Sequence, residues 1–403
     1  MKPTEKTKKN SSKVSSRLSL GERVPKLRFP GFEGEWERTS LGEKCKIIMG
    51  QSPDSASYNT IGVGIPLVQG NADIKNRVSC PNRHTSKPTK ICRPNSVLLS
   101  VRAPVGTVGI ANQTLCLGRG VCAIESDNNA FLYQFLIFKE DSWRNIEQGG
   151  TFTAINGDDI KKFTFIMPCE IEREKIATFL SLIDSSIATQ RKLVELLKKH
   201  KRGLIKRLFR PNEHTKWKSV RLGEVGTFHK GAPLSKADIS EDGKPFILYG
   251  ELYTTYGEII KDVVRRTTAE IDIPYLSRCG DVIIPTSGET AEEIATASCI
   301  MSDGVVLGGD LNIYRSEHID GRFLAYAVRF IISRDISRIA QGVSVVHISA
   351  TELKRISVSI PSKDEQIRII SVLENYDNRI LHSYDILKKL EVTKDGLLQQ
   401  LFV

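Results

Sequence analysis

The sequence predicts an α+β protein built by tandem duplication of two α/β domains, each followed by a long helix, with the two helices pairing as an antiparallel coiled coil. Two observations predict this fold class. The segment GLIKRLFR at residues 203–210 recurs as GLLQQLFV at residues 396–403. Before each ending, apolar residues recur at alternating steps of four and three, which is typical of a helix that buries one stripe against another helix.

The two halves of the chain match over most of their length. In the C-terminal part of each half the spacing is constant at 193 residues, so that Pro168 falls on Pro361. Upstream the spacing shrinks to 181 residues between Trp36 and Trp217, which both open the motif W-x-x-x-x-L-G-E. A spacing that changes in steps indicates small insertions in the second copy with the register kept between them. Common ancestry of the two halves therefore explains the match.

The composition is that of a globular protein, with 40% apolar and 26% charged residues in a chain of 403, enough for two or three domains. The formal net charge of +11 favours a polyanionic partner such as nucleic acid or a membrane surface. The sequence has no run of about 18 apolar residues, so we expect no membrane-spanning helix. The eight cysteines form no C-x-x-C pair and do not cluster with the seven histidines, which argues against a zinc site.

The predicted organisation is one tail followed by two domain–helix pairs. The first 20 residues are rich in Lys, Ser and Thr and contain no apolar run, so we expect a disordered basic tail in a cytoplasmic protein. A loose arm that contacts nucleic acid is the alternative for this tail. The predicted divisions are the tail at 1–20, the first α/β domain at 21–162, its helical segment at 163–210, the second α/β domain at 211–355 and its helical segment at 356–403.

Each α/β domain is predicted from short apolar runs bounded by Gly, Pro and Asn, such as SVLLSVR in the first copy and DVIIPTS in the second. These runs indicate strands joined by turns, and the polar loops between them could form a recognition surface on a rigid frame. The two copies are weakly alike in the domains and strongly alike in the helical segments. This contrast suggests that the helices share one geometry, whereas the domains are free to read different partners.

Each helical segment follows a proline and begins with acidic residues, which suit the positive end of a helix dipole. Polar residues interrupt the apolar stripe at matching places, with Lys201 in the first copy and Lys394 in the second. Two amphipathic helices that each pack on their own domain are the alternative to a coiled coil. The predicted seam consists of Ile176, Leu180, Ile183, Ile187, Val194, Leu197, Leu204 and Leu208 in the first copy and Ile369, Leu373, Tyr376, Ile380, Leu387, Leu390, Leu397 and Leu401 in the second.

Motifs of catalysis are scarce in this chain. It contains neither a G-x-x-x-x-G-K-[ST] loop nor a G-x-S-x-G motif, so we predict no catalytic residue and no metal site. The alternative is a stand-alone metal-dependent nuclease that uses Asp54, Asp73 and Lys75, whose order matches a Pro-Asp…Asp-x-Lys pattern. The second copy has no carboxylate at the place of Asp54. Two further hypotheses are a scaffold with no role on DNA and a binder of single strands or RNA, which would need stacking aromatic residues.

Several paired segments together resemble one family. They are GQSPDSASYN and YGELYTTYGE, SVLLSVRAPVG and GDVIIPTSG, the segment LGGDLNIYR, and the doubled W-x-x-x-x-L-G-E motif. With the two repeated helices, they resemble the specificity subunit of type I restriction–modification enzymes over about residues 20–403. The first copy departs from the second at two turns, where Arg119-Gly120 replaces Gly309-Asp310 and Asn95-Ser96 replaces Gly280-Asp281.

The resemblance implies that each α/β domain is a target recognition domain that docks on one half of a split, asymmetric site in double-stranded DNA. It implies that the paired helices space the domains and bind two methyltransferase subunits, through which restriction subunits join. The chain would then be a non-catalytic subunit of an adenine DNA methyltransferase and ATP-dependent endonuclease. S-adenosylmethionine, ATP and magnesium would bind to the partner subunits, and no cofactor to this chain.

Candidate DNA-binding residues are polar residues in loops next to the predicted strand ends. Arg reads guanine and Asn or Gln reads adenine in the major groove, while contacts to phosphates set the register. The candidates are Gln51, Ser52, Gln69, Asn71, Arg83, Lys87 and Arg102 in the first domain and Lys230, Tyr249, Tyr253, Arg265, Thr286 and Ser287 in the second.

Overall fold

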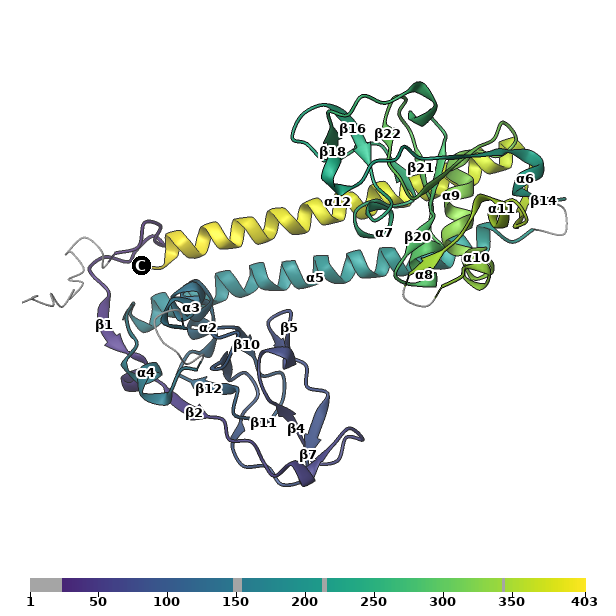
Figure 1. Ribbon diagram of the computed structural model, residues 1–403. Helices are drawn as coiled ribbons and strands as arrows, with labels where there is room; N and C mark the ends of the chain where they lie inside the picture. The colour runs from purple at the N-terminus through teal and green to yellow at the C-terminus, as the bar shows by residue number, and fades with distance from the viewer. Residues whose placement is uncertain (1–23, 148–153, 212–215, 343–344) are drawn as a thin grey trace, which may run out of the picture. The chain divides into compact units, whose positions relative to one another are not determined.

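The computed structural model describes residues 24–147, 154–211, 216–342 and 345–403, and the tail expected at 1–20 lies outside them. Two long helices, α5 (Glu170–Leu208) and α12 (Lys363–Leu401), follow the two α/β domains (Figure 1). Contacts divide the chain into two compact units. Of the described residues, unit 1 comprises those up to Arg191 together with Ile386–Val403, and unit 2 comprises those within Lys192–Asp385. Each unit therefore contains one α/β domain and a part of both long helices.

Unit 1 contains a six-stranded sheet in the order β2-β12-β9-β10-β6-β5 and a five-stranded sheet in the order β3-β7-β4-β11-β8. A third sheet consists of the two strands β1 and β13, and β13 directly precedes α5. The strands are β1 (Glu37–Ser40), β2 (Lys46–Met49), β3 (Tyr58–Asn59), β4 (Ile65–Val68), β5 (Ile74–Lys75), β6 (Val78–Ser79), β7 (Arg83–Thr85), β8 (Ile91–Cys92), β9 (Val97–Ser100), β10 (Val108–Ile110), β11 (Leu115–Leu117), β12 (Val121–Glu125) and β13 (Thr164–Met167). The helices are α1 (Leu41–Lys44), α2 (Asn129–Phe138), α3 (Glu140–Glu147) and α4 (Gly157–Lys162), with single 3-10 turns η2 (Ser55–Ser57) and η3 (Asn71–Asp73).

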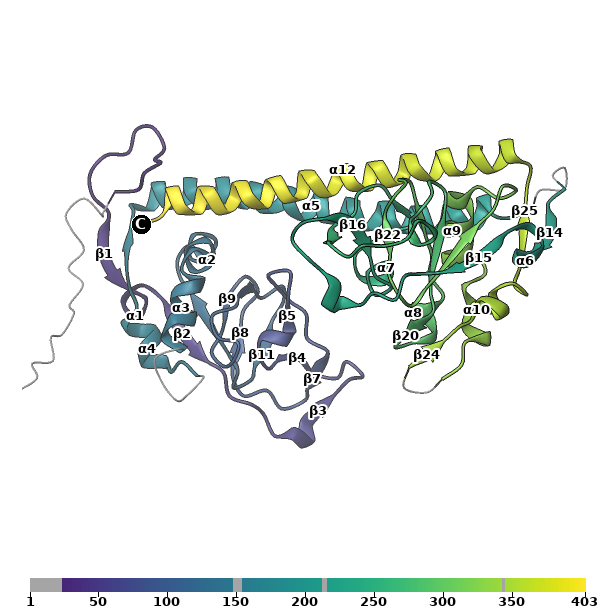
Figure 2. The same cartoon turned by 45° about the horizontal axis from the view of Figure 1, so that its top comes forward.

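Unit 2 contains a five-stranded sheet in the order β15-β23-β19-β21-β17 and a three-stranded sheet in the order β18-β16-β22. β14 pairs with β25 and β20 with β24 (Figure 2). The strands are β14 (Lys218–Arg221), β15 (Thr227–Lys230), β16 (Lys244–Ile247), β17 (Ile259–Ile260), β18 (Arg265–Thr267), β19 (Val282–Pro285), β20 (Ser287–Gly288), β21 (Ser298–Ile300), β22 (Val306–Leu307), β23 (Leu311–Arg315), β24 (Val346–His347) and β25 (Ser357–Ile360). The helices are α6 (Leu222–Val225), α7 (Glu251–Thr254), α8 (Ala291–Ile294), α9 (Gly321–Phe330), α10 (Ser333–Ile339) and α11 (Ala350–Leu353), with 3-10 turns η4 (Lys236–Asp238) and η5 (Ile273–Tyr275).

The two domains share one strand plan, which confirms the predicted duplication. β12 pairs antiparallel with β2 and β9 in unit 1, and β23 pairs in the same way with β15 and β19 in unit 2. The parallel pair β4–β11 corresponds to the parallel pair β16–β22. The apolar runs at β9 and β19 are buried along their whole length, and each strand lies inside its sheet between two neighbours. The predicted fold class, two α/β domains each followed by a long helix, is confirmed.

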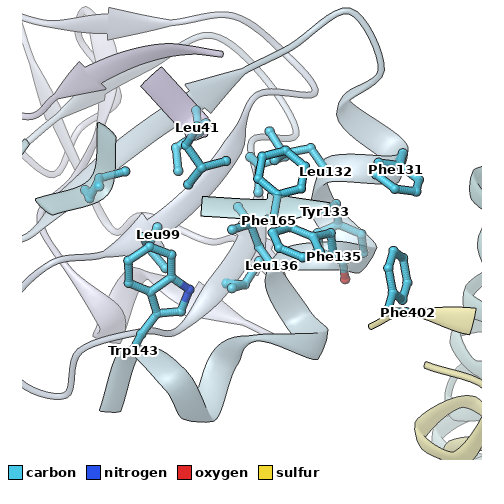
Figure 3. Packing of buried hydrophobic residues seen from close by; sticks show 14 of the residues in the cluster. Leu41, Leu99, Phe131, Leu132, Tyr133, Phe135, Leu136, Trp143, Phe165 and Phe402 are labelled. Atoms are coloured by element: carbon cyan, nitrogen blue, oxygen red, sulfur yellow. The ribbon is translucent and has the colours of Figure 1, made fainter. Parts of the chain in front are cut away.

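The core of unit 1 is an aromatic cluster that joins the domain to both long helices. Phe135 of α2 packs on Phe165 of β13, with ring centroids 4.6 Å apart. Phe402, at the C-terminal end of the chain, contacts Phe131 with a centroid distance of 5.4 Å (Figure 3). Ile176 of α5 and Leu401 of α12 are buried in the same cluster. In unit 2, Phe209 after α5 stacks on Phe323 of α9 at 4.7 Å.

Within each unit the two long helices contact each other in antiparallel order. In unit 1, Asp184 of α5 pairs with Lys394 of α12 at 2.6 Å, and Arg191 further along α5 pairs with Glu391, which lies earlier on α12. In unit 2, Lys201 pairs with Asp377 at 2.5 Å. Each helix therefore packs both on an α/β domain and on the other helix, so helix pairing and packing on a domain occur together.

Every predicted seam residue is buried or half-buried, but the stripe needs one correction near the helix ends. Leu204 and Leu397, which the predicted seam contains, are only half-buried. The residues that directly follow them, Ile205 and Leu398, are buried instead. A strict seven-residue repeat drifts by about 20° per heptad on a straight helix, so the apolar face moves around the helix over several heptads.

Among the described residues, no helix is long and apolar enough to cross a membrane.

Candidate nucleic-acid interface

The strands of unit 1 that precede the predicted reading loops end together. β2 and β9 both end beside the start of β12, with Met49 opposite Cys122 and Ser100 opposite Val121. β4 and β11 end side by side because they are parallel, and β7 begins there because it is antiparallel to β4. We call this surface the loop edge of unit 1, and it is formed by Gln51, Ser52, Gln69, Arg83, Arg102 and Arg119.

Backbone contacts hold this loop edge together at the turn Gly118–Gly120. The amide of Gln51 donates to the carbonyl of Leu117 at 2.9 Å, and the amide of Gly120 donates to the carbonyl of Gln69 at 3.0 Å. A Cβ atom at Gly120 would lie 2.3 Å from that Gln69 oxygen, so only glycine allows the turn to approach the end of β4 so closely.

Side chains on the loop edge of unit 1 support one another without acidic partners. The Ser52 hydroxyl accepts hydrogen bonds from the backbone N and Nε of Arg119, at 3.2 and 3.4 Å. Arg83 Nη1 donates to Gln69 Oε1 at 3.3 Å. Arg83, Arg102 and Arg119 are exposed, and none of the three forms an ion pair with a described residue. The edge can therefore present positive charge and amide groups to a ligand.

The remaining candidates of the first domain lie elsewhere. Asn71 begins η3, two residues after Gln69, and is half-buried. Lys87 is exposed in the segment between β7 and β8, and it is Thr89, two residues further on, whose hydroxyl donates to the carbonyl of Gln51 at the loop edge. That Asn71 and Lys87 contact DNA stays a prediction.

The nuclease alternative has no support in this arrangement. The Asp54 carboxylate accepts a hydrogen bond from the amide of Ala56 at 3.1 Å, and the Asp73 carboxylate accepts one from the amide of Gln69 at 2.7 Å. Each carboxylate thus closes its own turn, and Lys75 is exposed on β5. Across the described residues, no group of three or more His, Cys, Asp or Glu side chains is placed to hold a metal ion.

Unit 2 has an equivalent loop edge with different side chains. Lys230 ends β15 opposite Asn312, and Arg265 begins β18 opposite Phe246, just as Arg83 begins β7 opposite Leu67. The amide of Thr286 donates to the Asp310 carbonyl at 2.8 Å, as the amide of Val101 donates to the Gly120 carbonyl in unit 1. We define the loop edge of unit 2 by Lys230, Leu248, Tyr249, Arg265, Thr286, Ser287 and Gly309.

Arg265 and Ser287 of the loop edge of unit 2 are engaged within the unit. Arg265 is paired with the carboxylate of Glu251, which is only 5% exposed. Ser287 is buried, and its hydroxyl lies 3.1 Å from Nδ1 of His347. The half-buried rings of Tyr249 and Tyr253 meet edge to face with centroids 6.5 Å apart, beside α7. The structure therefore brings Tyr249, Tyr253 and Arg265 together, and these candidates stay predictions as DNA contacts.

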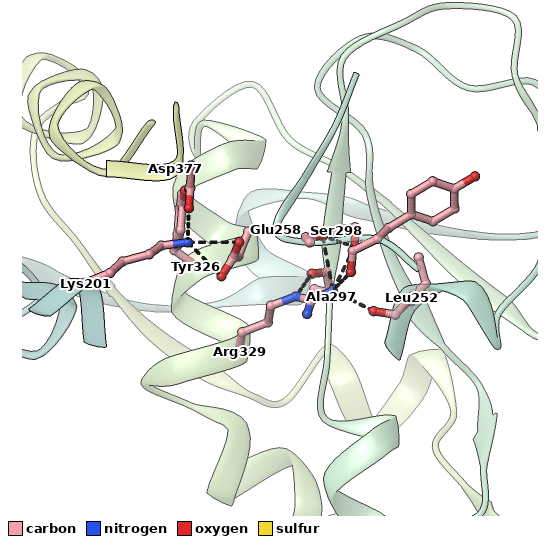
Figure 4. A network of polar contacts seen from close by, with 10 residues as sticks. Lys201, Leu252, Glu258, Ala297, Ser298, Tyr326, Arg329 and Asp377 are labelled. Atoms are coloured by element: carbon pink, nitrogen blue, oxygen red, sulfur yellow. Dashed lines mark hydrogen bonds and ion pairs between the residues drawn. The ribbon is translucent and has the colours of Figure 1, made fainter. Parts of the chain in front are cut away.

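Two residues outside the predicted set have prominent places. Arg119 lies at the centre of the loop edge of unit 1, and its signal was the presence of arginine where the second copy has Gly309. Arg329 of α9 is held inside unit 2 and anchors the segment that follows Tyr249. Its guanidinium donates to the carbonyls of Ala297 at 2.6 Å and Leu252 at 2.7 Å (Figure 4). An arginine in an amphipathic helix gives no sequence signal for such a role.

Replacing Arg329 by methionine is expected to lower the free energy of unfolding of unit 2 by about 2 kcal/mol, because the carbonyl oxygens of Ala297 and Leu252 lose a charged donor. Hydrogen exchange should quicken at residues 252–257 before it changes elsewhere in unit 2. The exposed Arg334 on α10 supplies the control, since Arg334→Met removes the same charge outside the network. Equal exchange in the two variants would contradict an anchoring role for Arg329.

Comparison with known proteins gives one consistent result. The model of the family "Type I restriction modification DNA specificity domain" matches the chain twice, at residues 33–199 and 214–392. The type I restriction enzyme MjaX specificity subunit of Methanocaldococcus jannaschii is 38% identical over 177 residues, which is 42% of each chain. The MjaIX specificity subunit of the same organism is 22% identical over 401 residues, covering 91% of this chain and 92% of that one.

Solved structures agree at the level of the fold. The S subunit of a type I restriction–modification system from M. genitalium aligns with a TM-score of 0.61 at 18% identity, over 94% of this chain and 99% of that one. A chain from a study of assembly and conformational transition of a type I system aligns with a TM-score of 0.57 at 16% identity, over the same shares.

Proposed function

Because this chain belongs to the type I restriction–modification DNA specificity family, we propose that it selects the DNA sequence on which a multisubunit methyltransferase and endonuclease acts. Each unit docks its loop edge on one half of a bipartite site in double-stranded DNA. The chain itself carries out no chemical step. Since the two loop edges present different side chains, the two half-sites have different sequences, and the whole target is asymmetric.

One observation carries this proposal. In each unit, the ends of equivalent strands meet at that unit's own loop edge. The strands correspond between the units, but the side chains on the two loop edges differ. A constant frame with variable loops is what two readers of different sequences require. The net charge of +11 supports a polyanionic ligand.

The long helices are proposed to pair along their length as a coiled coil, to set the unread gap between the half-sites, and to bind two methyltransferase subunits. Exposed apolar residues on the helices support the last role, since Leu182, Leu381 and Val392 are each more than 60% exposed. Restriction subunits join through the methyltransferase subunits. S-adenosylmethionine, ATP and magnesium bind to those partner subunits. The complex works in the cytoplasm.

The test is to express the chain with its methyltransferase subunits in a host that lacks other adenine methylation, and to sequence the methylated genome. We expect one new adenine-methylated motif made of two unlike half-sequences and a gap of constant length. The same subunits without this chain should give no motif. A continuous motif, or the same motif in the absence of the chain, would overturn the proposal.

A further inference from the structure

The loop edges of the two units differ in charge at equivalent places. Arg83, Arg102 and Arg119 of unit 1 correspond, by strand register and backbone hydrogen bonds, to Arg265, Ser287 and Gly309 of unit 2. The three arginines of unit 1 form no ion pair with described residues, whereas the charge of Arg265 is balanced by Glu251. Unit 1 therefore presents three uncompensated guanidinium groups where unit 2 presents none.

Arg119 is held at the centre of this edge in a fixed position. The turn that carries it is pressed against the end of β4, since a Cβ atom at Gly118 would lie 3.0 Å from the Cα of Gln69. The Ser52 hydroxyl accepts from both the backbone N and the Nε of Arg119. Nη1 and Nη2 make no hydrogen bond with any described residue, so the outer fork of the guanidinium remains available.

We propose that Arg119 determines specificity by donating two hydrogen bonds, from Nη1 and Nη2, to O6 and N7 of a guanine in the half-site bound by unit 1. This inference rests on the proposed function and assigns to it a base and a residue. A bidentate contact to guanine needs an arginine whose two outer nitrogens are both free to donate, and the contact of Nε to Ser52 leaves Nη1 and Nη2 free. Unit 2 has glycine at this position, so its half-site is read without an equivalent contact.

A base contact fits Arg119 better than a phosphate contact. The Ser52 hydroxyl contacts Arg119 directly, and the backbones of Gln51 and Gln69 hydrogen-bond to the turn that carries it; Ser and Gln side chains are types that read base edges. Side chains that bind only phosphates need charge but no fixed orientation. Arg83 and Arg102 lie on the same edge and supply that charge, and Arg83 also donates to Gln69.

The experiment compares Arg119→Gln with Arg38→Gln in the full chain, co-expressed with its methyltransferase subunits. Arg38 is an exposed arginine of unit 1 on β1, away from the loop edge, so its substitution removes the same charge. For each variant, methylation would be measured over the genome and on DNA duplexes that carry each of the four bases at every position of the wild-type motif.

For Arg119→Gln we expect one guanine position in one half-site to lose its preference by roughly 5- to 150-fold, with the other half-site and the gap unchanged. Arg38→Gln should keep the wild-type motif. The inference is overturned if Arg119→Gln keeps the full motif, or if it weakens methylation equally for all four bases. A wild-type chain that directs no split motif would instead refute the proposed function, and this result is distinct from the other two.

Discussion

Replacing Lys201 by methionine is expected to lower the free energy of unfolding of unit 2 by about 3–5 kcal/mol, because it leaves two half-buried carboxylates without the cation that they share. Lys201 is only 8% exposed and lies in α5. Its Nζ contacts Asp377 of α12 at 2.5 Å and both carboxylate oxygens of Glu258 at 3.1 Å (Figure 4). Burial raises the pKa of Tyr326, so its hydroxyl stays protonated and donates to Asp377.

Lys394 should behave in the same way in unit 1. It is 7% exposed and pairs with Asp184, whose other carboxylate oxygen accepts a hydrogen bond from Gln134 at 2.6 Å. Removing both members, as in Lys394→Met with Asp184→Leu, is expected to recover most of the loss, since no charge is then left buried alone.

Amide hydrogen exchange measured peptide by peptide distinguishes the destabilisation of the two units. Lys201→Met should speed exchange within residues 192–385, whereas Lys394→Met should speed exchange in unit 1. Lys199→Met is the matched control, since Lys199 is exposed on the same helix. If Lys201→Met proved as stable as Lys199→Met, the ion pair would contribute nothing and the expectation would be wrong.

A second large effect is expected where two strand ends meet in the loop edge of unit 1. A Cβ atom at Gly50 would lie 2.0 Å from the carbonyl oxygen of Gly118 and 2.4 Å from that of Val121. Because both obstacles are backbone atoms, Gly50→Ala should force the strands apart and lower the free energy of unfolding by about 3 kcal/mol. Urea unfolding of the full chain measures this loss, and methylation should fall for one half-site together with it.

The helical glycines supply an internal control. Nothing lies within 4 Å of a Cβ atom built at Gly203 or Gly396, and both lie within long helices. Alanine there should raise the free energy of unfolding by roughly 0.5–1 kcal/mol, because glycine loses more backbone entropy on forming a helix. If Gly50→Ala also stabilised the protein, the close approach at the loop edge would be disproved.

Much of the architecture could be predicted from the sequence because it rests on local, repeated signals. The duplication follows from matched residues, and the helices follow from an apolar period that continues over the whole segment. Ile176 and Leu180 are buried as expected. Five of the seven candidates in the first domain lie at the loop edge, because polar residues directly beside strand ends gather wherever those strands are neighbours.

Other features depend on contacts between segments far apart in the chain. The sequence shows that Lys201 matches Lys394 and that Asp184 matches Asp377, but not that each lysine meets the aspartate of the other copy. Arg329 is another case, since its partners are Ala297, directly before β21, and Leu252 of α7. Periodicity reports which face of one element is apolar, and it carries no information about which element will cover that face.

The sequence by itself determined the twofold plan, the long helices and the set of polar loops. Only the tertiary structure decided which loop residues share an edge, that Arg119 lies at its centre, and that the equivalent place in unit 2 is uncharged. The physical reason is that strand order and register place these side chains, and both arise from non-local backbone pairing that no local pattern encodes.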